Sequence, residues 1–181
     1  MKTARLRLEP LTVAHAQLVL DYVTENRAYL APWEPLRSDD SLTLDAQRRE
    51  LARSDVDRAA GMCARFAAFE HDGSQLAAIV NLWDIRHGVI ETAVLGYSVG
   101  ERFSGRGYAT EAAGAVVRHA FERFGLHRVQ ASYQPENVAS ERVLRKLGFM
   151  VEGYAREFLF LNGMWRDAVL TSRINRRTTL R

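Results

Sequence analysis

The sequence predicts an α/β fold with seven strands and about four helices, and three observations support this. Segments with the period of two that is typical of half-buried strands alternate with segments whose apolar residues recur every three or four positions, as on one helix face. Asp-Gly and Asn-Gly pairs, which favour tight hairpin turns, lie at 72–73 and 162–163 between predicted strands. A strand at 89–99 leads into a glycine-containing turn and then an alanine-rich helix.

The size and composition of the chain predict one compact domain over residues 1–181. It is 47% hydrophobic and 26% charged, with no sign of disorder or compositional bias. No apolar run reaches the roughly 18 residues of a membrane span, and the alternating N-terminus lacks the apolar core of a signal peptide. Cys63 is the only cysteine, which excludes an internal disulfide and agrees with a reducing compartment. We therefore expect a cytoplasmic protein without membrane association.

The formal charge of +3 is modest, and arginines are densest between Arg173 and Arg181. This tail either contacts RNA or a ribosome or is simply a solvated terminus. So small an excess gives no reason to expect direct DNA binding. The histidines have no metal-ligand spacing, so we predict no metal; they are His15, His71, His87, His119 and His127.

Before residue 89, the pattern predicts three strands and two helices. Residues 4–9 alternate as a strand, and Thr12 then caps an amphipathic helix. A more polar helix is predicted at 41–60, and strands at 64–70 and 75–83 flank the Asp-Gly turn.

A loop is predicted from Asn26 to Arg37, around Pro32-Trp33-Glu34-Pro35. Two prolines around an aromatic residue forbid continued helix and hold the indole in a fixed place. Such a loop either walls a substrate pocket or covers the core with its aromatic ring.

The strand at 89–99 contains Gly96, where a missing side chain indicates a bulge or the close approach of a ligand or backbone. The alanine-rich helix is predicted from 106 to 124, with Gly125 as its stop, and a short strand at 128–133 follows.

A last helix is predicted to begin after Asn137, its N-cap, and to end at Gly148. Strands at 150–160 and 164–172 then form a hairpin around the Asn-Gly turn.

The turn Gly105-Arg106-Gly107 is a candidate phosphate cradle. The first N–H groups of a helix have no partner within it, the dipole favours an anion there, and glycine lets a ligand approach the backbone. Tyr108 and Ala109 stand where a P-loop needs Lys-Ser/Thr, and Thr110 where a dinucleotide loop needs a third small residue. A turn that only caps the helix is the structural alternative.

Ser140 places a hydroxyl on the apolar stripe of the last predicted helix, with Val143, Leu144 and Leu147. A buried hydroxyl needs a partner. Either it bonds an earlier carbonyl of its own helix, or it faces the site and donates to a leaving group.

These motifs together resemble the GNAT acetyltransferases. The turn is similar to their pyrophosphate loop, Gln/Arg-x-x-Gly-x-Gly/Ala, in the register Arg102-x-x-Gly105-x-Gly107 or Ser104-x-x-Gly107-x-Ala109. The stretch Asn137-x-x-Ser140-x-x-Val143-x-x-Lys146-Leu147-Gly148-Phe149 resembles a signature of the branch that acetylates ribosomal-protein N-termini. Further matching blocks are Glu25-Asn26-Arg27, Pro32-Trp33-Glu34-Pro35, Leu95-Gly96-Tyr97-Ser98, Glu152-Gly153-Tyr154-Ala155 and Gly163-Met164-Trp165-Arg166-Asp167.

The resemblance implies the GNAT fold, with a mixed, mostly antiparallel seven-stranded sheet. It implies direct acetyl transfer from acetyl-CoA, in one ternary complex, to the N-terminal alanine of a ribosomal protein, and allows ribosome association. The pantetheine arm would run beside Tyr97, Ser98 and Val99, whose strand parts from its neighbour at a Gly96 bulge, and Asn137 would lie against the cofactor. The pyrophosphate would bind the amides of Ser104, Gly105, Arg106, Gly107, Tyr108 and Ala109.

The resemblance also suggests the catalytic groups. Ser140 would protonate the leaving thiolate, because Leu144 stands where the commoner tyrosine acid would be. Leu159 replaces the glutamate base of some relatives, which leaves Glu34 as the candidate base, with Asn81 and Asp84 also on the acceptor side. An α-amine with a pKa of about 7.7–8.0 could instead lose its proton to water.

Two rival functions remain at the level of the sequence. One is acetylation of a small amine, which would favour an acid-lined pocket that the sequence does not display. The other is a ribosome-binding or assembly module with a relic cofactor site, suggested by the arginine-rich tail.

Overall fold

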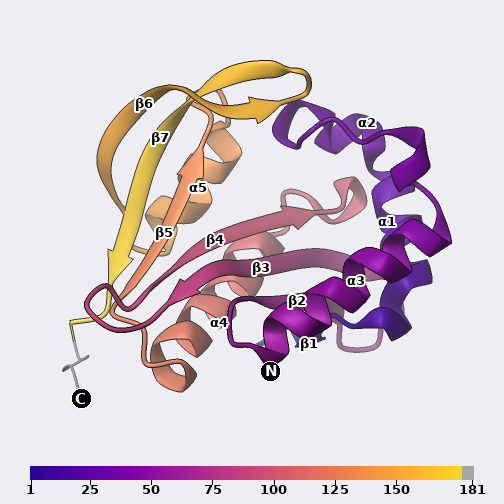
Figure 1. The fold of residues 1–181 in the computed structure, drawn as a ribbon, viewed down its shortest axis with the longest axis horizontal. Coiled ribbons are helices and arrows are strands. Elements are labelled where there is room, and N and C mark those ends of the chain that lie inside the picture. The colour runs from indigo at the N-terminus through magenta and orange to yellow at the C-terminus, as the bar shows by residue number, and fades with distance from the viewer. Residues whose placement is uncertain (177–181) are drawn as a thin grey trace.

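The computed structural model describes residues 1–176, in which seven strands form one sheet in the order β1-β2-β3-β4-β5-β7-β6 (Figure 1). The β4–β5 pair is parallel and the other pairs are antiparallel, so the predicted mixed, mostly antiparallel sheet is confirmed. The strands are β1 (Leu6–Pro10), β2 (Ala64–Glu70), β3 (Leu76–Arg86), β4 (Thr92–Val99), β5 (Arg128–Tyr133), β6 (Met150–Leu161) and β7 (Met164–Ile174).

The four predicted helices are present in this part of the chain, together with a short fifth one. The helices are α1 (Ala16–Glu25), α2 (Arg27–Leu30), α3 (Leu44–Ala59), α4 (Tyr108–Arg123) and α5 (Val138–Lys146). Single 3-10 turns lie at Val13–His15, Ala31–Trp33, Asp39–Ser41 and Glu101–Phe103. Among residues 1–176, no helix has both the length and the apolar content needed to cross a membrane.

The loop predicted between Asn26 and Arg37 was wrong in its first half, which is α2 and the 3-10 turn Ala31–Trp33. Pro32 is compatible with that turn because it lies at its start, where the missing N–H of proline breaks no helical hydrogen bond. Trp33 is 36% exposed and therefore does not plug the core.

Each face of the sheet has its own apolar core. Helix α4 covers one face and packs through small residues such as Ala112, Ala113 and Val116, which are fully buried. Helices α1 and α3 cover the other face, where Leu51 packs with Phe69. Figure 1 shows α3 and α4 on opposite sides of the central strands.

Strands β4 and β5 pair only at their beginnings, from Thr92 opposite Arg128 to Val94 opposite Gln130. Beyond this point β4 stays with β3, whereas β5 turns toward the β6–β7 hairpin (Figure 1). The edge of β4 that faces β5 is therefore unpaired over Leu95 to Val99 within the described residues.

The bulge predicted at Gly96 is wrong. Gly96 pairs with Asn81 in regular register, and the irregularity of this strand pair lies between Trp83 and Arg86. A Cβ on Gly96 would lie 2.2 Å from Cη2 of Trp83. The missing side chain thus leaves room for an indole that lies against the strand.

Strand β4 also begins later than the predicted residue 89. Glu91 has a φ of 33°, which interrupts an extended strand, and its carboxylate accepts hydrogen bonds from the Gly88 N–H and the His87 ring. Val89 is 96% exposed at the tip of this loop. The apolar residues Val89 and Ile90 therefore belong to a turn closed by the Glu91 carboxylate and not to the strand.

Candidate active site

The turn before α4 presents unpaired backbone donors. Gly105 and Gly107 have φ angles of 74° and 80°, which side chains rarely adopt, and Gly107 is the N-cap. The first backbone hydrogen bond of the helix joins the Glu111 N–H to Gly107 O, so the N–H groups of residues 108–110 have no acceptor within it. A Cβ on Gly105 would meet nothing within 4 Å. The backbone is open to an anion from this side.

The side chains of Arg5 and Glu111 anchor this turn to the start of the chain. Oε1 of Glu111 accepts from Oγ1 of Thr3 at 2.6 Å and from the Arg5 N–H at 2.7 Å, and Oε2 pairs with the Arg5 guanidinium at 2.6 Å. Nη1 of Arg5 donates to the carbonyl of Arg106 at 2.7 Å. The first strand of the sheet is therefore connected directly to the middle of the cradle.

Two tyrosines fix the ends of the same turn. The Tyr29 hydroxyl donates to Oγ of Ser104 at 2.9 Å, and the Tyr108 hydroxyl donates to Oε1 of Glu70 at 2.5 Å. The bond to Glu70 raises the pKa of Tyr108. Because these contacts engage side chains, they leave the backbone donors of the turn available.

We expect Glu111→Gln to destabilise the protein by about 1–2 kcal/mol at pH 7, because it removes a charged acceptor of several hydrogen bonds. Burial alone would raise the pKa of Glu111, but the bonds from Thr3 and Arg5 and the Arg5 charge outweigh it, and the pKa is lowered. A carboxyl group whose pKa is lowered by folding stabilises the fold at pH values above its ordinary pKa of about 4.3. This stabilisation is lost as the pH falls through the folded-state pKa.

Urea unfolding at pH 7 and near pH 4 tests this. The difference in free energy of unfolding between wild type and Glu111→Gln should become smaller at the lower pH. Glu122→Gln, which changes an exposed residue of the same helix, should leave this free energy unchanged. An equal gap at both pH values would contradict the proposed role of the charge.

The predicted cofactor strand β4 points its side chains alternately to the two faces. Ser98 faces α1, where the buried Tyr22 hydroxyl donates to its Oγ at 3.0 Å. Tyr97 and Val99 pack on the α4 side. After the strand, Oδ1 of Asn26 accepts from the Glu101 N–H at 2.7 Å.

The structure brings Ser140 and Tyr97 together. Asn137 is the N-cap of α5, as predicted, and its side-chain oxygen accepts from the Ser140 N–H at 3.0 Å. Oγ of Ser140 lies 2.9 Å from the Tyr97 hydroxyl, which also donates to the Ser140 carbonyl at 3.3 Å. The serine hydroxyl therefore points out of its helix toward β4, and its partner is a phenol and not an earlier carbonyl of the helix.

Burial raises the pKa of Tyr97 to about 12, against a smaller opposite effect of the Ser140 contact. The phenol is accordingly protonated at neutral pH and can donate. When it donates to Oγ of Ser140, the serine proton is free for another acceptor.

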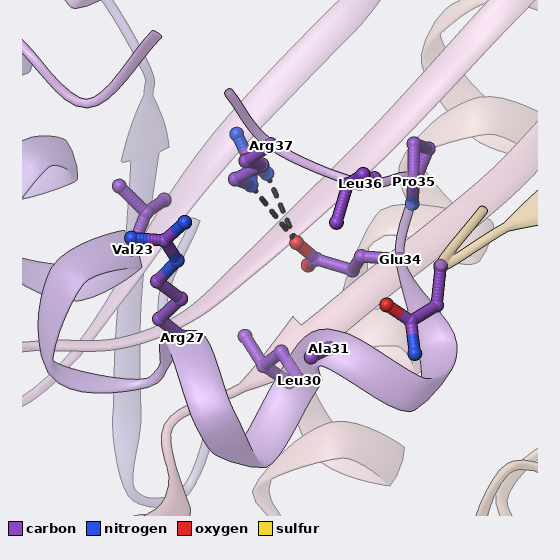
Figure 2. Close-up of a pocket in the computed structure, with 9 residues that line it drawn as sticks. Val23, Arg27, Leu30, Ala31, Glu34, Pro35, Leu36 and Arg37 are labelled. Carbon is purple, nitrogen blue, oxygen red and sulfur yellow. Dashed lines mark hydrogen bonds and ion pairs between the residues drawn. The ribbon is translucent and has the colours of Figure 1, made fainter. Parts of the chain in front are cut away.

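Glu34 lines a pocket between α2 and the β6–β7 hairpin, and Figure 2 shows this pocket. Its Oε2 accepts from Nη2 of Arg37 at 3.0 Å and from Nε at 3.2 Å, and the two side chains point toward each other. The carbonyl of Glu34 accepts from the Asn162 N–H at 3.0 Å. The loop around Pro35 thus lines a pocket, and that substrate binds in it stays a prediction.

Asn81 and Asp84, predicted beside the acceptor, have different surroundings. Nε of Arg65 donates to Oδ1 of Asn81 at 3.2 Å, whereas Asp84 forms an exposed ion pair with Arg86 at 2.5 Å. No cluster of three or more His, Cys, Asp or Glu side chains able to hold a metal occurs in residues 1–176. Residues 177–181 of the arginine-rich tail lie outside the described part of the chain.

Sequence reasoning missed several residues that position the site: Arg5, Tyr22, Asn26, Tyr29, Arg37 and Glu111. For Glu111 the only signal in the sequence is an acidic residue in the first turn of a helix, and Tyr22 adjoins the apolar face of α1. The Glu25-Asn26-Arg27 block was a usable signal for Asn26, whose amide is 6% exposed and fully engaged.

Comparisons with known proteins agree with this geometry. Residues 5–150 match the family model described as an acetyltransferase (GNAT) domain. The chain is 33% identical over 172 residues to the [ribosomal protein uS5]-alanine N-acetyltransferase of Escherichia coli K12, covering 95% of this chain and 89% of that protein.

Two solved structures are similar over nearly the whole chain. The ribosomal-protein-S5-alanine acetyltransferase of Vibrio fischeri superposes with a TM-score of 0.95 at 28% identity, over 99% of this chain and 98% of that one. RimJ of Mycobacterium smegmatis, solved in complex with CoA-disulfide, has a TM-score of 0.90 at 25% identity, over 97% and 84%.

Proposed function

The chain belongs to the GNAT acetyltransferase family, whose members are acetyl-CoA-dependent, and we propose that it acetylates the N-terminal alanine of a ribosomal protein. The main support is the 33% identity to a ribosomal-protein-alanine acetyltransferase over 95% of the chain. Ribosome association and action as a single domain belong to the same proposal. The free donors of the cradle add an independent physical reason to expect a diphosphate-bearing substrate.

In the proposed complex, the backbone of residues 104–109 binds the pyrophosphate of acetyl-CoA, and the open backbone donors at the start of α4 support this. The unpaired edge of β4 at Tyr97, Ser98 and Val99 offers main-chain groups to the pantetheine amides. The Oδ1 of Asn137 is already used as a cap, so its amide nitrogen is the group that would contact the cofactor.

The reaction joins the amine nitrogen of the acceptor to the acetyl carbon and breaks the carbon–sulfur bond, whose electron pair leaves with sulfur. The nitrogen loses a proton and the thiolate gains one. Ser140 is the proposed donor to sulfur, and the Tyr97 hydroxyl lies 2.9 Å from its Oγ, where it can donate to the serine oxygen in place of the Ser140 carbonyl. A thiol pKa of about 8.5 makes this donation a modest requirement.

Glu34 is the proposed acceptor of the amine proton, directly or through water. Both donors of Arg37 fall on Oε2, which leaves Oε1 for the acceptor ammonium. We expect Glu34→Gln to lower kcat/KM by about ten-fold at pH 7, and less at pH 9, where an amine with a pKa of about 8 is already neutral.

A pH profile of kcat/KM checks the role of Glu34, with Glu122→Gln as the control because that exposed carboxylate lies at the end of α4. If kcat/KM of Glu34→Gln were lowered by the same factor at pH 7 and pH 9, Glu34 would have a structural role and would not accept the amine proton.

The proposed function is tested by incubating the protein with acetyl-CoA and a peptide array that varies the N-terminal residue, and by following release of free CoA. Alanine-starting peptides should react best. Acetylation of spermidine alone would instead indicate a small-amine enzyme. Binding of acetyl-CoA without turnover on any acceptor would favour a relic cofactor site.

A further inference from the structure

Helices α1 and α3 cover one face of the sheet only in part. Near β5 this face is exposed to solvent. Successive residues on this face of β3 are Ile79, Asn81 and Trp83. Ile79 is 6% exposed and packs in the core with α1 and α3, Asn81 is half-buried, and Trp83 is 45% exposed. The cover therefore ends at Asn81, opposite Gly96 and next to the point where β4 and β5 part.

The side-chain amide of Asn81 has a fixed orientation on this exposed part of the sheet face. Arg65 donates through Nε at 3.2 Å, and an N–H can only be accepted by the amide oxygen, so Oδ1 faces Arg65. Arg65 is itself paired through Nη1 with Glu50 at 2.9 Å. No partner of the Asn81 Nδ2 group occurs among residues 1–176, so this group remains a donor for a ligand.

The indole of Trp83 lies over Gly96, the residue that pairs with Asn81. The distances from an ideal Gly96 Cβ to its Cη2, Cζ3 and Cζ2 are 2.2, 2.6 and 3.2 Å, so the six-membered ring covers the space of the missing side chain. The ring is an apolar platform with limited freedom, because any shift toward β4 is blocked by the backbone. Exposed aromatic rings with little conformational freedom are favoured in recognition sites.

We propose that Asn81 and Trp83 form a subsite for the acceptor residues that follow the reacting amine, an inference that rests on the proposed function. The Nδ2 of Asn81 donates to a main-chain carbonyl of the acceptor beyond its first residue, and the Trp83 ring packs against the side chain of a neighbouring acceptor residue. The ligand is thus an extended peptide, which offers both a carbonyl and a side chain. A small polyamine offers neither.

The test compares two acceptors, alaninamide and a six-residue alanine-starting peptide with an apolar second residue. Trp83→Ala and Asn81→Asp should each raise KM for the peptide about ten-fold, while KM for acetyl-CoA and kcat/KM for alaninamide stay unchanged. Asn81→Asp retains an oxygen for Arg65 and removes the donor. Calorimetry of the peptide with the protein and CoA should show the same ten-fold loss without turnover.

The control is Val56→Ala, which truncates an exposed apolar side chain of α3. The proposal is overturned if the peptide KM and affinity are unchanged in both variants, or if alaninamide and peptide lose activity equally. A wild-type protein that transfers acetyl to neither acceptor would refute the proposed function itself, whereas an active wild type with unaffected variants would refute only the subsite.

Discussion

Gly107→Trp is expected to weaken coenzyme A binding by more than about 100-fold, roughly 2.8 kcal/mol. The residue has a φ of 80° at the N-cap of α4, and its neighbours on the helix side are the unpaired donors of the cradle. A tryptophan there would strain the backbone that presents the N–H groups, and its Cβ would lie 3.4 Å from Nη2 of Arg5, whose Nη1 holds the Arg106 carbonyl. Calorimetric titration with coenzyme A measures the loss directly.

Gly125→Trp is the matched control, since Gly125 lies after the C-terminal end of the same helix with a φ of 69° and no atom within 4 Å of its ideal Cβ. It carries a comparable backbone strain and leaves the cradle unchanged. Thermal unfolding of both variants separates lost binding from lost folding. Equal losses of coenzyme A affinity in the two proteins would be incompatible with a cradle at Gly107.

Ser140→Ala is expected to lower kcat by about 100-fold, the lower end of what general acid catalysis contributes, with little change in KM for acetyl-CoA. The low end is expected because a thiolate is a good leaving group. Tyr97→Phe, which removes the hydroxyl 2.9 Å from Oγ, should cause a smaller loss by leaving the serine without its partner.

Steady-state kinetics with saturating acceptor measure both parameters, and Ser54→Ala is the control because it removes a buried helical serine from α3. An unchanged kcat in Ser140→Ala would exclude this serine as the acid. A rise in KM for acetyl-CoA with unchanged kcat would assign it to substrate binding instead.

Local chemistry explains why much of the fold could be predicted. The hairpin turn at Asn162-Gly163 has positive φ at both residues, and the cap at Asn137 uses its own side chain, so each signal acts within a few positions. Strands β2 and β5 begin and end at the predicted residues for the same reason. The family resemblance supplied the mixed, mostly antiparallel character of the sheet, which local patterns do not contain.

The remaining features depend on contacts between distant residues. Arg5 meets Glu111 across 106 positions, and Trp83 lies over Gly96 only once β3 and β4 are paired. A glycine inside a strand pattern indicates that something approaches closely, but the sequence does not say what. The bulge expected at Gly96 and the early start of β4 were wrong because both require knowledge of neighbouring side chains.

The salt bridge from Arg5 to Glu111 links ligand affinity to the folding of the sheet edge. Strand β1 is terminal in the sheet, and edge strands tend to open before the rest of a protein. If opening of β1 releases the cradle, coenzyme A at 100 times its Kd should oppose that opening by about 2.7 kcal/mol. Slower amide hydrogen exchange of residues 6–9 in the presence of coenzyme A would then report occupancy of a loop a hundred residues away.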